Sequence, residues 1–126
     1  MEGKENQEAE EEEESPQQIR MDNLRKVTML VVRIAAYNAE YAIRLGSPEA
    51  HVRNTKIILK RVQEFARDTF CDEMEEYIRD RLRHFIMLNR LHAQYGLRWA
   101  KDKYEVKDVK GERILRQVEA LHRIVF

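Results

Sequence analysis

A short break between two long runs of helical pattern constrains this chain more than any other feature, and it consists of Gly46, Ser47, Pro48 and Glu49. Glycine readily adopts the left-handed conformation that commonly follows the last turn of a helix, so we expect Gly46 to end one helix. Ser47 is expected to cap the next helix, with Pro48 at its first position and Glu49 at the positive end of its dipole. The sequence therefore predicts a tight helical hairpin that pivots at Gly46.

Apolar residues on both sides of this hairpin recur every three or four positions, as on one face of a helix. The first run extends from about residue 18 to residue 45, and its apolar positions are Leu24, Val27, Val31, Ile34, Ala35, Ala42 and Leu45. The second run carries Val52, Ile58, Leu59, Val62, Phe65, Ala66 and Phe70. Each run predicts an amphipathic helix that turns one face toward a core.

A further break is expected near residues 68–72. Neither Gly nor Pro occurs between Pro48 and Gly96, and one helix of that length is unusual in a small domain. Thr69 with Asp72, or Asp72 with Glu75, is expected to form the cap of the third helix.

Two more helices complete the expected architecture. The third helix is expected to end at Gly96 or to continue through Trp99, and residues 101–110 are expected to form an irregular link or a short strand. A last helix is expected after Gly111. Four amphipathic helices joined by short connections predict an all-α fold with a four-helix bundle-like domain.

The charges divide the chain into an acidic tail and a basic body. The first 15 residues hold eight Glu and one Lys, whereas residues 16–126 hold 22 Lys and Arg against 15 Asp and Glu. Residues 1–17 are expected to be a disordered tail, because they contain too few apolar residues to offset the entropy of ordering. Residues 18–126 are expected to form a single helical domain. The tail is either a solubilising segment or a tethered polyanion that competes with nucleic acid for the body.

Several classes of protein are excluded or disfavoured. The single Cys excludes a disulfide framework within the chain and a zinc site built on several thiolates. No apolar run approaches the roughly 20 residues that span a bilayer, and no secretion signal is visible, so we expect a soluble, intracellular protein with no membrane partner. There is no Gly-rich phosphate loop and no nucleophile elbow. Asp80, His84 and His92 share roughly one helix face, but no second helix completes a metal site, so no metal and no cofactor are expected.

Rows of cations follow the second and third predicted helices. On the second helix the row consists of Arg53, Lys56, Lys60 and Arg67, with Arg61 beside it. On the third helix it consists of Arg79, Arg83 and Arg90. Such rows suit contacts to a phosphate backbone, and Tyr95 and Trp99 are expected to stack on unpaired bases near one end. The alternative interpretation is an ordinary solvated face.

A six-residue segment suggests a second function. The residues Arg79 to His84 resemble the Arg-polar-x-x-x-His signature of the HEPN ribonucleases, which are small helical proteins that often dimerise. The resemblance implies a metal-independent ribonuclease in which Arg79 stabilises phosphate charge and His84 acts as acid or base on the ribose 2′-OH. The chain departs from the family at position 86, where Ile replaces a frequent Tyr.

The sequence as a whole predicts a non-catalytic protein that binds nucleic acid, RNA or DNA, without sequence specificity. The first helix also has a wide apolar face, which suggests self-association as a homo-oligomer through the first and last helices; its extra residues are Met29, Leu30, Tyr37 and Tyr41. In architecture the chain resembles the small helical subunits of CRISPR effector complexes and the helical coat proteins of filamentous archaeal viruses. The alternatives are the ribonuclease and a protein–protein adaptor without a nucleic-acid role.

Overall fold

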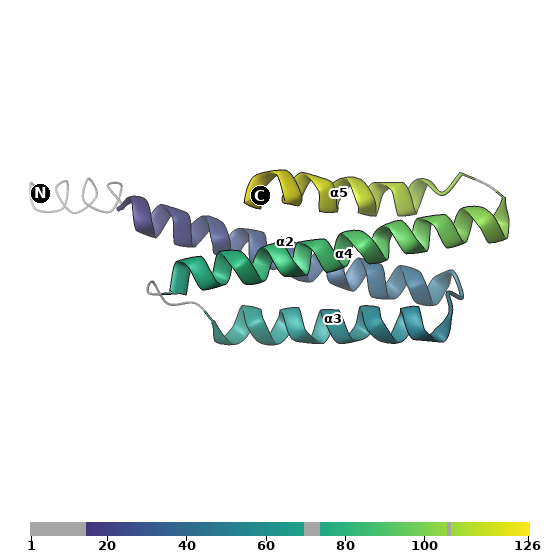
Figure 1. The fold of residues 1–126 in the computed structure, drawn as a ribbon, viewed down its shortest axis with the longest axis horizontal. Coiled ribbons are helices and arrows are strands. Elements are labelled where there is room, and N and C mark those ends of the chain that lie inside the picture. The colour runs from purple at the N-terminus through teal and green to yellow at the C-terminus, as the bar shows by residue number, and fades with distance from the viewer. Residues whose placement is uncertain (1–14, 70–73, 106) are drawn as a thin grey trace, which may run out of the picture.

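The structure of the chain is a computed structural model that describes residues 15–69, 74–105 and 107–126. These residues form four helices that pack against one another as a bundle: α2 (Pro16–Arg44), α3 (Glu49–Asp68), α4 (Glu75–Tyr104) and α5 (Val109–Val125) (Figure 1). The expected all-α, bundle-like fold is confirmed. The expected acidic tail lies almost wholly outside the described residues, as does Asp72.

Helices α2 and α4 form the middle of the bundle, because each of them packs against all three other helices. Helices α3 and α5 lie on opposite sides of this pair, and their described residues do not contact each other (Figure 1). A surface on α3 and a surface on α5 are therefore separated by the body of the protein.

The predicted hairpin is present, and the end of α2 has the expected left-handed glycine. Gly46 has a φ of 64°, and its N–H donates to the carbonyl of Ile43 at 3.0 Å. The N–H of Ser47 donates to the carbonyl of Ala42, also at 3.0 Å. These two bonds form a Schellman motif, which satisfies the carbonyl groups at the end of a helix.

The predicted cap of α3 is wrong by one residue. Pro48 is at the N-cap position and no side chain caps the helix, so Glu49 is the first helical residue. Ser47 is buried, and its hydroxyl has no hydrogen-bond partner in the structure. The first backbone hydrogen bond of α3 runs from the N–H of Val52 to the carbonyl of Pro48 at 3.1 Å, which makes Pro48 the N-cap in place of Ser47.

The start of α2 and the boundary between α3 and α4 lie close to the predicted positions. Helix α2 begins at Pro16, where the hydroxyl of Ser15 accepts the N–H of Gln18 at 3.1 Å and the Gln18 side chain accepts the N–H of Ser15 at 3.0 Å. The expected break after α3 is present, since α3 ends at Asp68 and α4 begins at Glu75. The N-cap of α4 is Met74, and no side chain among the described residues caps the helix; the predicted cap residue Asp72 lies outside them.

Helix α4 continues well past the glycine that was one of its two expected ends. Gly96 is buried inside the helix, and His51 of α3 lies 3.7 Å from where a Cβ of residue 96 would be. The helix ends instead at Tyr104, where Glu105 takes a left-handed φ of 55°. A short strand in 101–110 is therefore wrong for its described residues, which are helical as far as Tyr104.

Helix α5 begins before Gly111 rather than after it. The side chain of Asp108 caps the helix by accepting the N–H of Gly111 at 3.0 Å. The helix therefore includes Val109 and Lys110 in its first turn, where the sequence interpretation placed a link.

The core lies where the apolar faces of all four helices meet. Its most completely buried apolar side chains come from every helix and are Met21, Val31, Val62, Ile78, Leu82, Phe85, Ile86 and Val118. Burial of such side chains is the main favourable contribution to folding. No helix in the described part of the chain combines the length and the apolar character needed to cross a membrane.

One polar contact crosses the middle of the bundle. The side-chain amide of Asn38 in α2 donates to the Oδ1 of Asn89 in α4 at 3.1 Å, and Asn89 donates to the carbonyl of Phe85 at 2.9 Å. Both asparagines are buried. A paired buried amide fixes the alignment of two helices, because any shift would leave polar groups unsatisfied.

Candidate nucleic-acid interface

The outer face of α3 carries the cationic row. Residues of an α-helix are spaced by about 100°, so the row lies opposite the buried face of α3. That buried face consists of His51, Thr55, Ile58, Val62 and Phe65. All five predicted cations of this helix are exposed, namely Arg53, Lys56, Lys60, Arg61 and Arg67.

Four of these five cations form no ion pair with any residue in the described ranges: Arg53, Lys56, Lys60 and Arg61. Arg53, Lys56 and Lys60 border an open hollow of about 430 Å³. Arg67 is different, because its Nε lies 3.1 Å from a carboxylate oxygen of Asp68, which raises the pKa of Arg67. The charge available to an external anion is therefore concentrated in the first two-thirds of α3.

The three arginines of the predicted row on α4, Arg79, Arg83 and Arg90, are turned toward the bundle. Arg79 lies 3.5 Å from Glu75, which also accepts a 2.7 Å hydrogen bond from Arg20 of α2. The hydrogen bond from Arg20 is the main cause of the lowered pKa of Glu75. Arg79 is partly buried, and its buried Nε has no hydrogen-bond partner among the residues that the structure describes.

Arg83 and Arg90 are also turned toward their own chain. Arg83 donates to the carbonyl of Val125 in α5 at 3.1 Å and lies 3.4 Å from Asp80. The Nε of Arg90 is buried and has no hydrogen-bond partner. Because Arg83 reaches α5, which lies across the bundle from α3, the two predicted rows do not form one groove.

The two predicted stacking residues, Tyr95 and Trp99, both lie on α4 but differ in their exposure to solvent. Tyr95 is exposed, and its ring centroid lies 4.5 Å from that of His51. Trp99 is half-buried, with the edge of Tyr104 at 6.1 Å between centroids and the ammonium of Lys103 at 4.8 Å. The face of Trp99 is thus already engaged by its own chain, whereas Tyr95 still offers an open side.

The two residues of the ribonuclease signature do not converge within one copy. Arg79 and His84 are five positions apart on α4, which places them about 140° apart around its axis. His84 is exposed beside Phe85, whereas Arg79 is partly buried against Glu75. No group of three or more His, Cys, Asp or Glu residues suited to a metal ion occurs in ranges 15–69, 74–105 and 107–126.

A histidine pair lies where α3 and α4 meet. The Nδ1 atoms of His51 and His92 are 3.2 Å apart, and the rings are 5.1 Å apart between centroids. Burial, followed by the nearby His92, lowers the pKa of His51 to about 4, and burial also lowers the pKa of His92. Both rings are therefore neutral at pH 7. Sequence reasoning missed this pair, because the two residues are far apart along the chain and belong to no motif.

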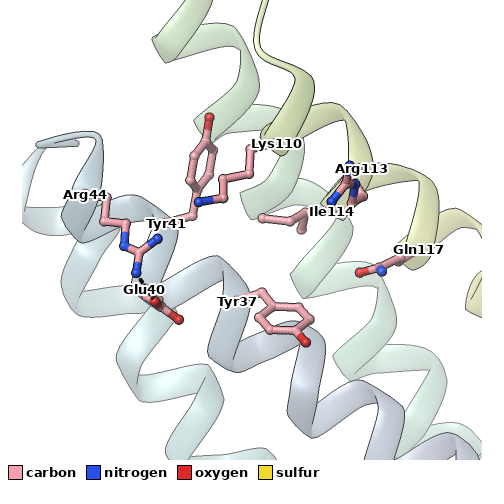
Figure 2. A pocket seen from close by; sticks show the side chains of 8 residues that line it. All are labelled: Tyr37, Glu40, Tyr41, Arg44, Lys110, Arg113, Ile114 and Gln117. Atoms are coloured by element: carbon pink, nitrogen blue, oxygen red, sulfur yellow. Dashed lines mark ion pairs between the residues drawn. The ribbon is translucent and has the colours of Figure 1, made fainter.

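A pocket of about 350 Å³ lies between the end of α2 and the start of α5 (Figure 2). Arg44 pairs with Glu40, one turn earlier on α2, at 2.6 Å on one side of the pocket. Lys110 and Arg113 line the same pocket from α5 and form no ion pair with any described residue. Sequence reasoning missed these cations because it placed Lys110 in a link. The sequence signal that could have found them is the position of Lys110 and Arg113 in the first turns of a helix, because the helix dipole disfavours cations there.

Comparison of the chain with known protein families, with curated proteins and with solved structures finds no match. Its function is therefore argued from its own surface.

Proposed function

We propose that this chain is a non-catalytic protein that binds the phosphate backbone of nucleic acid through the outer face of α3. The single observation that carries the proposal is the exposed set Arg53, Lys56, Lys60 and Arg61, which forms no ion pair with the described residues. We call these four residues the α3 cations. Glu49 and Glu64 are also exposed on this helix, so the α3 cations outnumber them by four to two. An excess of exposed positive charge along a helix favours a partner of negative charge.

The length and spacing of α3 suit a linear polyanion. Its 20 residues extend over about 30 Å, and the cations Arg53, Lys56 and Lys60 recur every three or four positions along it. Contacts of Lys and Arg to phosphate carry no sequence information, so binding is expected to be non-specific. Arg79, Arg83 and Arg90 of α4 do not take part, because Glu75, Asp80 and the bundle itself engage them.

Self-association is the second part of this proposal. On α2 the side chains of Met29 and Leu30 are 60% and 40% exposed, and on α5 the side chain of Ile124 is 67% exposed. Apolar side chains open to water on two neighbouring helices favour burial against another copy. Copies that pack side by side would each contribute a few phosphate contacts along one strand.

The experiment that tests the proposal is a titration of nucleic-acid binding against salt concentration. Backbone binding predicts an affinity that falls steeply as salt increases, because each phosphate contact releases counterions. A protein–protein adaptor predicts no binding at any salt concentration. A ribonuclease predicts cleavage of RNA that is lost in His84→Ala while binding is retained.

A further inference from the structure

The pocket between α2 and α5 is separate from the α3 cations. It lies at the end of α2 and the start of α5, and α5 is on the opposite side of the bundle from α3 (Figure 1). Its volume of about 350 Å³ falls within the range of roughly 300–1,000 Å³ typical of small-molecule sites. A ligand here would leave the outer face of α3 uncovered.

Hydrogen bonds fix the walls of the pocket. The hydroxyl of Tyr41 donates to the carboxylate of Asp108, and the same carboxylate accepts the N–H of Gly111. At the same end of the bundle, the hydroxyl of Tyr104 donates to the carbonyl of Leu45 at 2.9 Å. The Tyr41 bond ties the start of α5 to α2, and the Tyr104 bond ties the end of α4 to the end of α2, so a ligand would not need to order the site on binding.

The charges of the pocket are not balanced. Arg44, Lys110 and Arg113 line it together with one carboxylate, that of Glu40, which pairs with Arg44. Lys110 and Arg113 lie in the first turns of α5, whose N-terminus is capped by the carboxylate of Asp108, so the excess positive charge comes from the two side chains themselves. The arrangement favours an anion with close to two negative charges, which is the charge of a phosphate monoester near pH 7.

The rest of the lining suits a flat ring. Tyr37 of α2 presents a half-open aromatic ring, Ile114 of α5 supplies an apolar wall, and the amide of Gln117 can donate and accept hydrogen bonds (Figure 2). Aromatic side chains of this kind stack on nucleobases. An aromatic and apolar wall below a cationic rim thus matches both ends of a nucleotide.

We propose that this pocket binds a nucleoside bearing a phosphate monoester, with the phosphate between Lys110 and Arg113 and the base against Tyr37. Two sources supply this chemistry, a free nucleoside monophosphate and the 5′-phosphorylated end of a strand. The inference goes beyond the binding of a strand along α3, because it concerns other residues on another side of the protein.

The test is isothermal titration calorimetry of the full chain with adenosine 5′-monophosphate, adenosine and inorganic phosphate. Adenosine 5′-monophosphate is expected to bind, and adenosine at least tenfold more weakly. Arg113→Gln and Lys110→Gln should each weaken binding of the monophosphate at least tenfold. Arg123→Gln, which removes an exposed cation of α5 outside the pocket, should leave the affinity unchanged.

Three results would overturn the inference: no heat with millimolar monophosphate, equal affinity for adenosine, or equal weakening by Arg123→Gln. Circular dichroism of each variant confirms folding, and both pocket cations are exposed, so their loss should not unfold the bundle. A trinucleotide with a 5′-phosphate, compared with its 5′-hydroxyl form, distinguishes the sources. Tighter binding of the phosphorylated trinucleotide than of the monophosphate assigns the pocket to strand ends, and the reverse assigns it to free nucleotides.

The same titration separates this inference from the proposed function. Lys56→Gln and Lys60→Gln on α3 should not change the affinity for the monophosphate, because neither residue lines the pocket. Loss of strand binding in those variants with monophosphate binding retained would support both proposals independently.

Discussion

The imidazole rings of His51 and His92 meet with their Nδ1 atoms 3.2 Å apart, and this contact joins α3 to α4. One of the two nitrogens must carry the proton, so the contact requires at least one neutral ring. Protonation of both rings would place two positive charges at hydrogen-bond distance in a partly buried site.

The histidine pair predicts that the protein loses stability in mild acid. An unfolded histidine has a pKa near 6.5, whereas the pKa of His51 in the folded protein is about 4. The unfolded chain therefore binds more protons, and the stabilisation present above pH 6.5 is lost as the pH falls toward 4. We expect a loss of about 2–3 kcal/mol in the free energy of unfolding between pH 7 and pH 4.

Urea denaturation at several pH values measures this loss. His51→Gln should flatten the dependence on pH, whereas His84→Gln should not, because His84 is exposed on the outer side of α4. A pH dependence that is the same in wild type and His51→Gln would show that the pair does not control acid stability.

Replacement of glycine by alanine is expected to lower the stability of the protein at one position and not at another. Gly46→Ala forces an alanine into a left-handed conformation, which costs about 1–2 kcal/mol although nothing lies within 4 Å of the new methyl group. Gly96→Ala lies inside α4 with its nearest neighbour at an ordinary 3.7 Å, so it should be neutral or stabilise by up to about 1 kcal/mol. Thermal unfolding of the two variants side by side measures the difference, and destabilisation by Gly96→Ala would contradict the tolerance of that site.

The packing of α4 predicts that replacing a buried leucine by alanine lowers the free energy of unfolding far more than replacing an exposed leucine. Leu82 is fully buried, so Leu82→Ala should reduce the free energy of unfolding by about 2–5 kcal/mol. Leu91 is 55% exposed on the same helix, so Leu91→Ala should change it by less than about 0.5 kcal/mol. Equal effects in urea denaturation would mean that α4 packs with a different face inward.

Self-association through α2 predicts that a charge on its exposed apolar face lowers the molar mass of the assembly in solution. Leu30→Glu should shift the protein toward monomer in size-exclusion chromatography with light scattering, because it places a charge on the exposed apolar face. Ile57→Glu changes an equally exposed residue on α3 and should not alter the mass. A wild-type chain that stays monomeric at high concentration would refute the assembly part of the proposal.

Local sequence signals predicted the features of the fold that depend on neighbouring residues. The hairpin at Gly46 depends on backbone preferences within a few positions, and the break after Asp68 was predicted from the unusual length of an uninterrupted helix; both are present. Gly96 was one of the two predicted ends of α4, but the helix continues through it. Burial of Gly96 against His51 outweighs the low helix propensity of glycine. The first turn of α5 was missed because Asp108 caps it from a segment with no helical pattern.

The candidate site was only partly predictable, because local sequence signals do not show contacts between different helices. The exposed α3 row follows from spacing along a single helix. Glu75 and Asp80 lie four and three positions before Arg79 and Arg83 on the same helix, so the spacing alone indicates these two ion pairs. The contact of Arg83 with the carbonyl of Val125 comes from another helix, and the sequence did not indicate it. The pocket between α2 and α5 joins residues more than sixty positions apart, and only the packed structure brings Arg44 and Arg113 together.

The salt dependence of binding measures whether the α3 cations contact the phosphate backbone. Fluorescence anisotropy with a labelled single strand and a labelled duplex gives the slope of log affinity against log salt, and four phosphate contacts predict a slope of about −3 to −4. Lys60→Gln should reduce the size of the slope by about 1, and Arg123→Gln on α5 should leave it unchanged. No binding at low salt, or a slope that Lys60→Gln leaves unaltered, would contradict a role for α3 in binding nucleic acid.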